Sequence, residues 1–143
     1  MELYIIRHGE TDWNKEKRLQ GRSDTELNEY GIELAEITGE ALKDVHFDCI
    51  YSSPLKRAYK TAEIIRGQRN LEIITDERLR EISFGVVEGV PMSERPDGFQ
   101  KFFTDPANYA DQQSRGRISA GEILLTASEN ERIIEEKRKE CAP

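Results

Sequence analysis

Leu3-Tyr4-Ile5-Ile6-Arg7-His8-Gly9-Glu10-Thr11 is the stretch that decides the fold of this chain. A short apolar run that ends in charge and glycine predicts a buried strand over residues 2–6, followed by a loop. Further apolar runs at 47–51 and 71–74 predict a second and a third strand. Strands separated by helices favour an α/β fold with a largely parallel sheet.

The segments between these strands carry helix signals. Apolar residues recur at helical spacing over 28–43, with Asn28 as the expected N-cap. A second helix is expected to begin at Ser52-Ser53-Pro54 and to stop at Gly67, because serine caps helices and proline fits the first helical position. Residues 9–27 are polar and are expected to form a long loop.

Length and charge exclude several function classes. The 143 residues fit one domain, and the net charge of −7 offers nothing to attract nucleic acid or an anionic membrane. Cys49 and Cys141 lie far apart in the sequence, which is no disulfide framework and suits a reducing cytoplasm. We therefore expect a cytoplasmic protein that acts on a small molecule, with no nucleic-acid or membrane partner.

The residues at the predicted strand ends suit phosphoryl transfer. Ligands of open α/β sheets bind beyond the carboxyl ends of the strands, and these ends carry Arg7, His8, Arg57 and Glu81. Guanidiniums hold phosphate oxygens, imidazole can attack phosphorus, and a carboxylic acid can protonate the leaving oxygen. Taken singly, each residue also has an ordinary structural reading, such as a surface ion pair or a solvated carboxylate.

Four ordered motifs are together far more specific. Arg7-His8-Gly9-Glu10-Thr11-x-x-Asn14 resembles the hallmark of the histidine phosphatase superfamily, phosphoglycerate-mutase-like branch. Three further stretches match that family in order over roughly residues 1–109: Leu19-Gln20-Gly21-Arg22-Ser23-Asp24, Tyr51-Ser52-Ser53-Pro54-Leu55-Lys56-Arg57-Ala58-x-x-Thr61-Ala62, and Leu79-Arg80-Glu81-Ile82-x-Phe84-Gly85-x-x-Glu88-Gly89. The resemblance implies a three-layer α/β fold whose parallel sheet is flanked by helices and is incomplete at the C-terminus.

The resemblance also implies the site residues. His8 is expected to be the nucleophile, Arg7 and Arg57 the phosphate clamp, and Glu81 the proton donor. Asn14, Gln20 and Gly21 are expected to line the substrate loop. No metal or other cofactor is implied, and the expected partner is a small phosphorylated metabolite.

The sequence departs from the family pattern after Tyr109. Residues 1–109 are expected to form a partial catalytic domain, and 110–143 an atypical charged tail that is helical or disordered. The resemblance implies a second active-site histidine after the acidic segment, but the remaining histidine, His46, lies before it. We hypothesise that the tail is a frame-shifted read-through; the rival is a natural short variant with a helix from about Ala120 to Lys139.

Three functions therefore compete. The first is hydrolysis of a phosphomonoester through phosphohistidine, weakened or lost without the second histidine. The second is a phosphoglycerate mutase, and the third is a non-catalytic remnant or phosphate-binding module. The apolar residues of 90–109, including Met92 and Phe99, line a substrate lid in one interpretation and pack on the core in the other.

Overall fold

The sheet is small and parallel. The computed structural model describes residues 3–95 and residue 99. Among these, β1 (Ile50–Ser52) and β2 (Ile73–Thr75) pair in parallel, with Ile50 opposite Ile73 and Ser52 opposite Thr75. The predicted second and third strands are thus confirmed, each shifted a few residues toward the C-terminus and shortened. The α/β class with a parallel sheet is confirmed as well.

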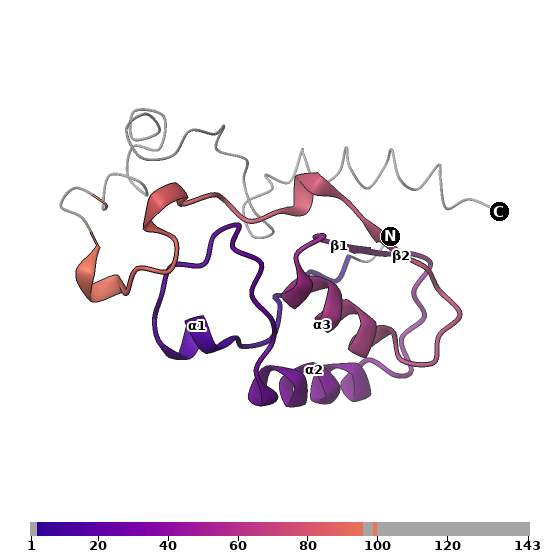
Figure 1. Cartoon of the computed structure of the whole chain (residues 1–143). Helices are drawn as coiled ribbons and strands as arrows, with labels where there is room; N and C mark the ends of the chain where they lie inside the picture. Colours follow the sequence, from indigo (N-terminus) through magenta and orange to yellow (C-terminus); the bar gives the residue numbers. More distant parts are fainter. Residues whose placement is uncertain (1–2, 96–98, 100–143) are drawn as a thin grey trace.

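Two helices lie on one side of this sheet. α2 (Glu29–Ala41) begins after Asn28, whose side chain accepts a hydrogen bond from the N–H of Gly31, so the predicted N-cap is confirmed. α3 (Lys56–Arg66) connects β1 to β2 and ends at Gly67, whose φ of 55° suits glycine, again as predicted. Figure 1 shows α3 between the sheet and α2. The second helix layer of the predicted fold is not among the described elements.

The start of α3 differs from the prediction. Ser52 and Ser53 are buried at the end of β1, and the N-cap of the helix is Leu55, which makes no side-chain cap bond. Instead, the N–H of Lys56 donates to Oδ1 of Asp24 at 2.7 Å. The capping side chain therefore comes from a loop 32 residues earlier in the sequence. Local sequence signals at the start of α3 cannot reveal such a distant cap.

The predicted first strand is wrong in the part that the structure describes. Residues 3–6 form no regular element, and no β-pairing of the described residues includes them. Their side chains are 39–67% exposed rather than buried. The physical reason is that an apolar run becomes a strand only where a neighbour supplies backbone partners, and β1 and β2 pair with each other instead.

The long loop contains a helix that the sequence analysis missed. α1 (Asp12–Lys15) is a single turn whose N-cap, Thr11, forms a capping box with Asn14. Later in the chain, three short 3₁₀ helices follow β2: η1 (Glu77–Leu79), η2 (Gly85–Val87) and η3 (Met92–Glu94).

The segment after β2 builds a small core with the loop after α1. Phe99 is 1% exposed and clusters with Leu19 and Val87, and Met92 packs against them. The core interpretation of these two predicted lid residues is thus favoured. The predicted tail, 110–143, lies outside the described residues.

Two further features of the described residues bear on the expected compartment. Cys49 is disulfide-bonded. One bond does not make a disulfide framework, but it differs from the free thiol expected in a reducing cytoplasm. In the described part of the chain, no helix has the length and apolar character that a bilayer crossing requires.

Candidate active site

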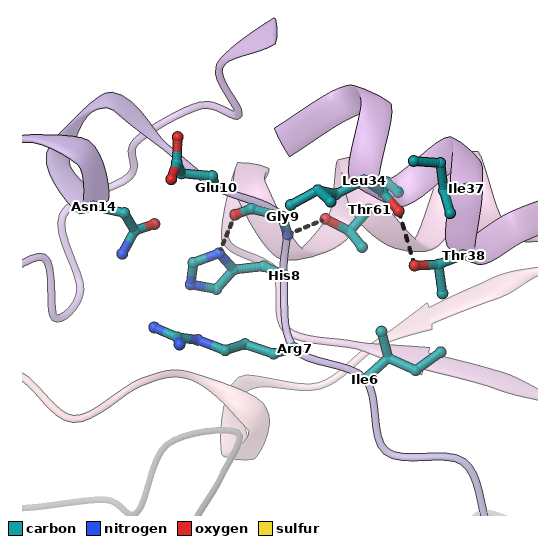
Figure 2. Close-up of a pocket in the computed structure, with 11 residues that line it drawn as sticks. Ile6, Arg7, His8, Gly9, Glu10, Asn14, Leu34, Ile37, Thr38 and Thr61 are labelled. Carbon is teal, nitrogen blue, oxygen red and sulfur yellow. Dashed lines mark hydrogen bonds between the residues drawn. The ribbon is translucent and has the colours of Figure 1, made fainter. Parts of the chain in front are cut away.

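A cavity of about 430 Å³ opens between the segment before α1 and the helices α2 and α3. Figure 2 shows its lining, in which the side chains of Arg7 and His8 point toward the same side as Asn14. The residues that line it are Ile6, Arg7, His8, Gly9, Glu10, Asn14, Leu34, Ala35, Ile37, Thr38 and Thr61. Three of the predicted site residues therefore share one cavity.

The imidazole of His8 is held in one tautomer. Its Nδ1 donates to the carbonyl oxygen of Gly9 at 2.7 Å, and because a carbonyl can only accept, Nδ1 carries the proton. Nε2 then holds a lone pair. Burial, together with the nearby charges of Arg57 and Arg7, lowers the pKa of His8 to about 4 against the opposing effect of the bond to Gly9. The ring is neutral at neutral pH and can act as a nucleophile.

Two glycines let the backbone of Gly9 and Glu10, which follow His8, lie against α2. A Cβ on Gly9 would fall 2.3 Å from the oxygen of Gly31, and a Cβ on Gly31 would fall 2.1 Å from the oxygen of Glu10. The N–H of Gly9 donates to the hydroxyl of Thr61 on α3 at 3.0 Å. The segment that follows His8 is thus fixed to both helices through its backbone.

The two predicted clamp arginines have different surroundings. Arg7 is exposed and lines the cavity, whereas Arg57 is 2% exposed. The guanidinium of Arg57 donates from Nη1 to the oxygen of Ser23 and from Nη2 to that of Gly21, both at 2.8 Å. Both positive charges are close enough to lower the pKa of His8.

Asn14 and Gln20 belong to one hydrogen-bond network. The hydroxyl of Thr11 lies 3.1 Å from Oδ1 of Asn14 and 2.8 Å from Oε1 of Gln20. The hydroxyl of Thr25 donates to the same oxygen of Gln20 at 2.6 Å. Neither Gln20 nor Gly21 lines the cavity. Gln20 is connected to the lining residue Asn14 through Thr11. Gly21 is bonded to Arg57, which does not line the cavity either.

Glu81 does not line the cavity either. Oε1 of its carboxylate accepts from the N–H of Ile82 at 2.9 Å, and its backbone oxygen accepts from Nε of Arg22 at 3.2 Å. The acidic residue that does line the cavity is Glu10, whose Oε1 accepts from the side chain of Asn28 at 3.0 Å. The role of Glu81 as proton donor stays a prediction.

Sequence reasoning gave no role to Glu10, Thr61 or Glu88, although all three lie inside the quoted motifs. Thr61 supports Gly9, and the carboxylate of Glu88 accepts from four donors. The available signal was their place in the motifs. Among the described residues, no group of three or more His, Cys, Asp or Glu side chains is arranged to hold a metal.

Taken together, the cavity offers a neutral nucleophile beside the exposed guanidinium of Arg7, and the buried charge of Arg57, which does not line the cavity, acts on the same ring. Such an arrangement can bind a phosphate dianion and attack its phosphorus atom, because guanidiniums neutralise the charge that would otherwise repel a nucleophile. The same groups also suit binding of inorganic phosphate without reaction.

The comparisons with known proteins agree with this geometry. Residues 3–130 match the family described as the histidine phosphatase superfamily (branch 1), so the match extends past Tyr109. The uncharacterized phosphatase PhoE of Bacillus subtilis is 46% identical over 91 residues, which are 64% of this chain and 47% of the relative. Phosphoserine phosphatase 1 of Hydrogenobacter thermophilus is 34% identical over 140 residues, covering 97% and 65%.

A solved structure shares the fold. YhfR of Bacillus stearothermophilus superposes with a TM-score of 0.75 at 39% identity, covering 91% of this chain and 65% of that one. The chain thus spans between about half and two thirds of the length of these relatives. Because the family match covers residues 3–130 and includes the site, the chain belongs to the histidine phosphatase superfamily.

Proposed function

We propose that the chain hydrolyses phosphomonoesters through a phosphohistidine formed on His8. The observation that carries this proposal is the state of the His8 ring: Nδ1 is protonated by its bond to Gly9, and burial lowers the pKa to about 4. A partly buried, neutral imidazole beside two positive charges is suited to attack on phosphorus. The relatives include two proteins named as phosphatases, which supports the same reaction class.

The reaction has two balanced steps. Nε2 of His8 forms a bond to phosphorus while the bond from phosphorus to the ester oxygen breaks, and Glu81 gives that oxygen a proton. Water then attacks the phosphohistidine, the N–P bond breaks, and inorganic phosphate leaves while the carboxylate recovers its proton. Arg7 and Arg57 stabilise the charge on the phosphoryl oxygens in both steps, a contribution on the order of 10²–10³-fold per donor.

The substrate is a small phosphorylated metabolite. The cavity of about 430 Å³ has room for a compact ester, and its far wall carries the apolar side chains of Leu34 and Ile37. A phosphoserine phosphatase among the relatives agrees with a small substrate. Transfer between the hydroxyls of a phosphoglycerate, the mutase reaction, is the alternative within the same family.

The second histidine bears on the rate. His46 has an 89% exposed side chain beside Asp48 and does not line the cavity. The chain is therefore proposed to turn over slowly, because one charge-stabilising donor that the family resemblance implies has no counterpart among its histidines.

A phosphate-binding module without turnover is the second candidate. The observation that favours it is the place of Glu81, whose carboxylate accepts a bond from Ile82 and does not line the cavity. Without a proton donor at the leaving oxygen, the clamp would bind phosphate and stop there.

A labelling experiment separates these functions. The full chain is incubated with ³²P-labelled acetyl phosphate and in parallel with p-nitrophenyl phosphate, with His8→Gln as the control. Hydrolysis predicts acid-labile label on the wild type, none on the variant, and phosphate release that depends on His8. Equal release by both proteins would refute catalysis at His8. Binding of inorganic phosphate without label identifies the module, and label that passes between 3- and 2-phosphoglycerate identifies the mutase.

A further inference from the structure

The loop 20–24, which runs from Gln20 to Asp24, is held from two sides. On one side α3 holds it: Arg57 donates to the oxygens of Gly21 and Ser23, and Lys56 donates its N–H to Asp24. The opposite side is held by the carboxylate of Glu88, at the C-terminal end of η2. The position of the loop therefore depends on both contacts.

The carboxylate of Glu88 accepts four hydrogen bonds, two from the loop 20–24 and two from residues 83 and 84. Its Oε2 accepts from the hydroxyl of Ser23 at 2.6 Å, and its Oε1 accepts from the N–H of Arg22 at 3.0 Å. Oε1 also accepts from the N–H of Phe84 at 3.0 Å and from the hydroxyl of Ser83 at 3.3 Å. One carboxylate thus ties the loop to the segment that follows Glu81.

Gly21 provides the room for this carboxylate. A Cβ on residue 21 would lie 2.4 Å from Oε1 of Glu88, and the φ of Gly21 is +54°. Residue 21 must therefore be a glycine for both the backbone conformation and the contact. Gly21 is also the residue whose carbonyl oxygen accepts from Nη2 of Arg57 at 2.8 Å.

We propose that Glu88 is a positioning residue for Arg57, and this proposal rests on the function proposed above. Glu88 accepts from the backbone N–H of Arg22 and from the side-chain hydroxyl of Ser23, and the carbonyl oxygens on either side of Arg22 are the two that accept from the guanidinium. Glu88 lies outside the cavity lining. Its effect reaches the phosphoryl group only through the direction of the Arg57 fork.

The first test reads Arg57 directly and needs no turnover. Because both Nη atoms donate to fixed carbonyls, rotation of the guanidinium is slow, and the ¹⁵N–¹H spectrum should resolve its Nη signals. These signals are assigned by their loss in Arg57→Lys. Glu88→Ala should broaden or merge them. Glu88→Gln should retain them, because an amide oxygen can replace Oε1 while Ser23 rotates to accept from the new NH₂.

The second test uses binding and rate. In the full chain, Glu88→Ala should weaken binding of inorganic phosphate about 10-fold and lower kcat for p-nitrophenyl phosphate by a similar factor, as expected when a charged hydrogen-bond group is lost. In an Arg57→Ala background, the same change should add less than about 2-fold, because the two residues act on one group. Glu94→Ala, a change at an exposed glutamate on η3, is the matched control.

The outcomes separate the two proposals. If the Arg57 signals are unchanged in Glu88→Ala, the positioning role is overturned. The same holds if the losses of phosphate affinity and kcat in Glu88→Ala add fully to those in Arg57→Ala. Glu88 would then only support the fold. A wild type that neither binds nor hydrolyses phosphate overturns the proposed function, while the Arg57 signals still decide the role of Glu88. If Glu88→Ala fails to fold, Ser23→Ala removes one of the four bonds and answers the same question.

Discussion

His8 is the residue whose surroundings decide the chemistry, because its ring is partly buried and lies beside two positive charges. Burial and these charges lower its pKa to about 4, from a usual value near 6.5. The rate of phosphohistidine formation should therefore be constant above about pH 5 and fall as the pH drops through 4, where the nucleophile takes up a proton.

An NMR titration of the His8 ring measures the same quantity. The midpoint should lie near 4 in the wild type and should rise in Arg57→Gln, because that change removes one of the charges that lower the pKa. A wild-type midpoint near 6.5 would show that the ring is solvated, and the proposed nucleophile would lose its basis.

Thr61 supports the nucleophile from α3. Its hydroxyl accepts from the N–H of Gly9 at 3.0 Å and donates to the oxygen of Arg57 at 2.8 Å. Thr61→Val keeps the shape and leaves the buried N–H of Gly9 without this acceptor, which should cost about 1–3 kcal/mol in the free energy of unfolding. Thr61→Ser keeps the hydroxyl and should retain both stability and rate. Urea unfolding of the two variants checks this, and an equal loss in both would assign the effect to the methyl group.

At the scale of elements, α2 offers a matched pair of glycines. Alanine is the better helix former by about 1 kcal/mol, so propensity alone predicts that both substitutions stabilise. A Cβ on Gly31, however, would lie 2.1 Å from the backbone oxygen of Glu10, whereas one on Gly39 would lie 3.3 Å from that of Ile64. Gly31→Ala should therefore be destabilising by at least about 2 kcal/mol relative to Gly39→Ala, because backbone atoms must move.

Urea unfolding of the two alanine variants measures this difference. Gly31→Ala should also slow labelling of His8, since the displaced backbone is that of Glu10, two residues after His8. Similar stabilities for the two variants would mean that α2 does not press on the catalytic segment.

The elements that the sequence predicts are those whose signals are local. Asn28 and the apolar spacing after it define the start of α2. Gly67 directly follows Arg66, the last residue of α3, and ends that helix. The start of α3 escapes prediction because its cap, Asp24, belongs to a distant loop. The run over residues 3–6 is read as a strand from its composition, but pairing depends on a neighbour that no local pattern reveals.

The same distinction holds for the site. Arg7, His8 and Asn14 lie within eight residues of sequence, and the structure places them in one cavity as expected. Arg57 comes from another element; its motif predicts a clamp role, its charge acts on His8, and it does not line the cavity. Its attachment to the carbonyls of the loop 20–24, and the hold of Glu88 on that loop, are contacts across 34 to 66 residues of sequence that only a folded chain shows.

For the whole molecule, the shifted pKa of His8 makes stability depend on pH. The folded state binds a proton at His8 only near pH 4, whereas the unfolded chain binds it near pH 6.5. Between these values the unfolded state holds more protons, so the free energy of unfolding falls as the pH drops from about 6.5 to 4 and is unaffected by this group above 6.5. The contribution amounts to about 2–3 kcal/mol over that window.

A comparison with His8→Gln isolates this contribution, because every other titrating group is common to both chains. The difference in unfolding free energy between wild type and variant should change by about 2–3 kcal/mol between pH 7 and pH 4, with the wild type losing more. Urea unfolding at half-unit steps of pH measures it. If the two curves run parallel, His8 has the same pKa in both states. The ring is then solvated, and Gly9, Gly31 and Thr61 fix a backbone rather than prepare a nucleophile.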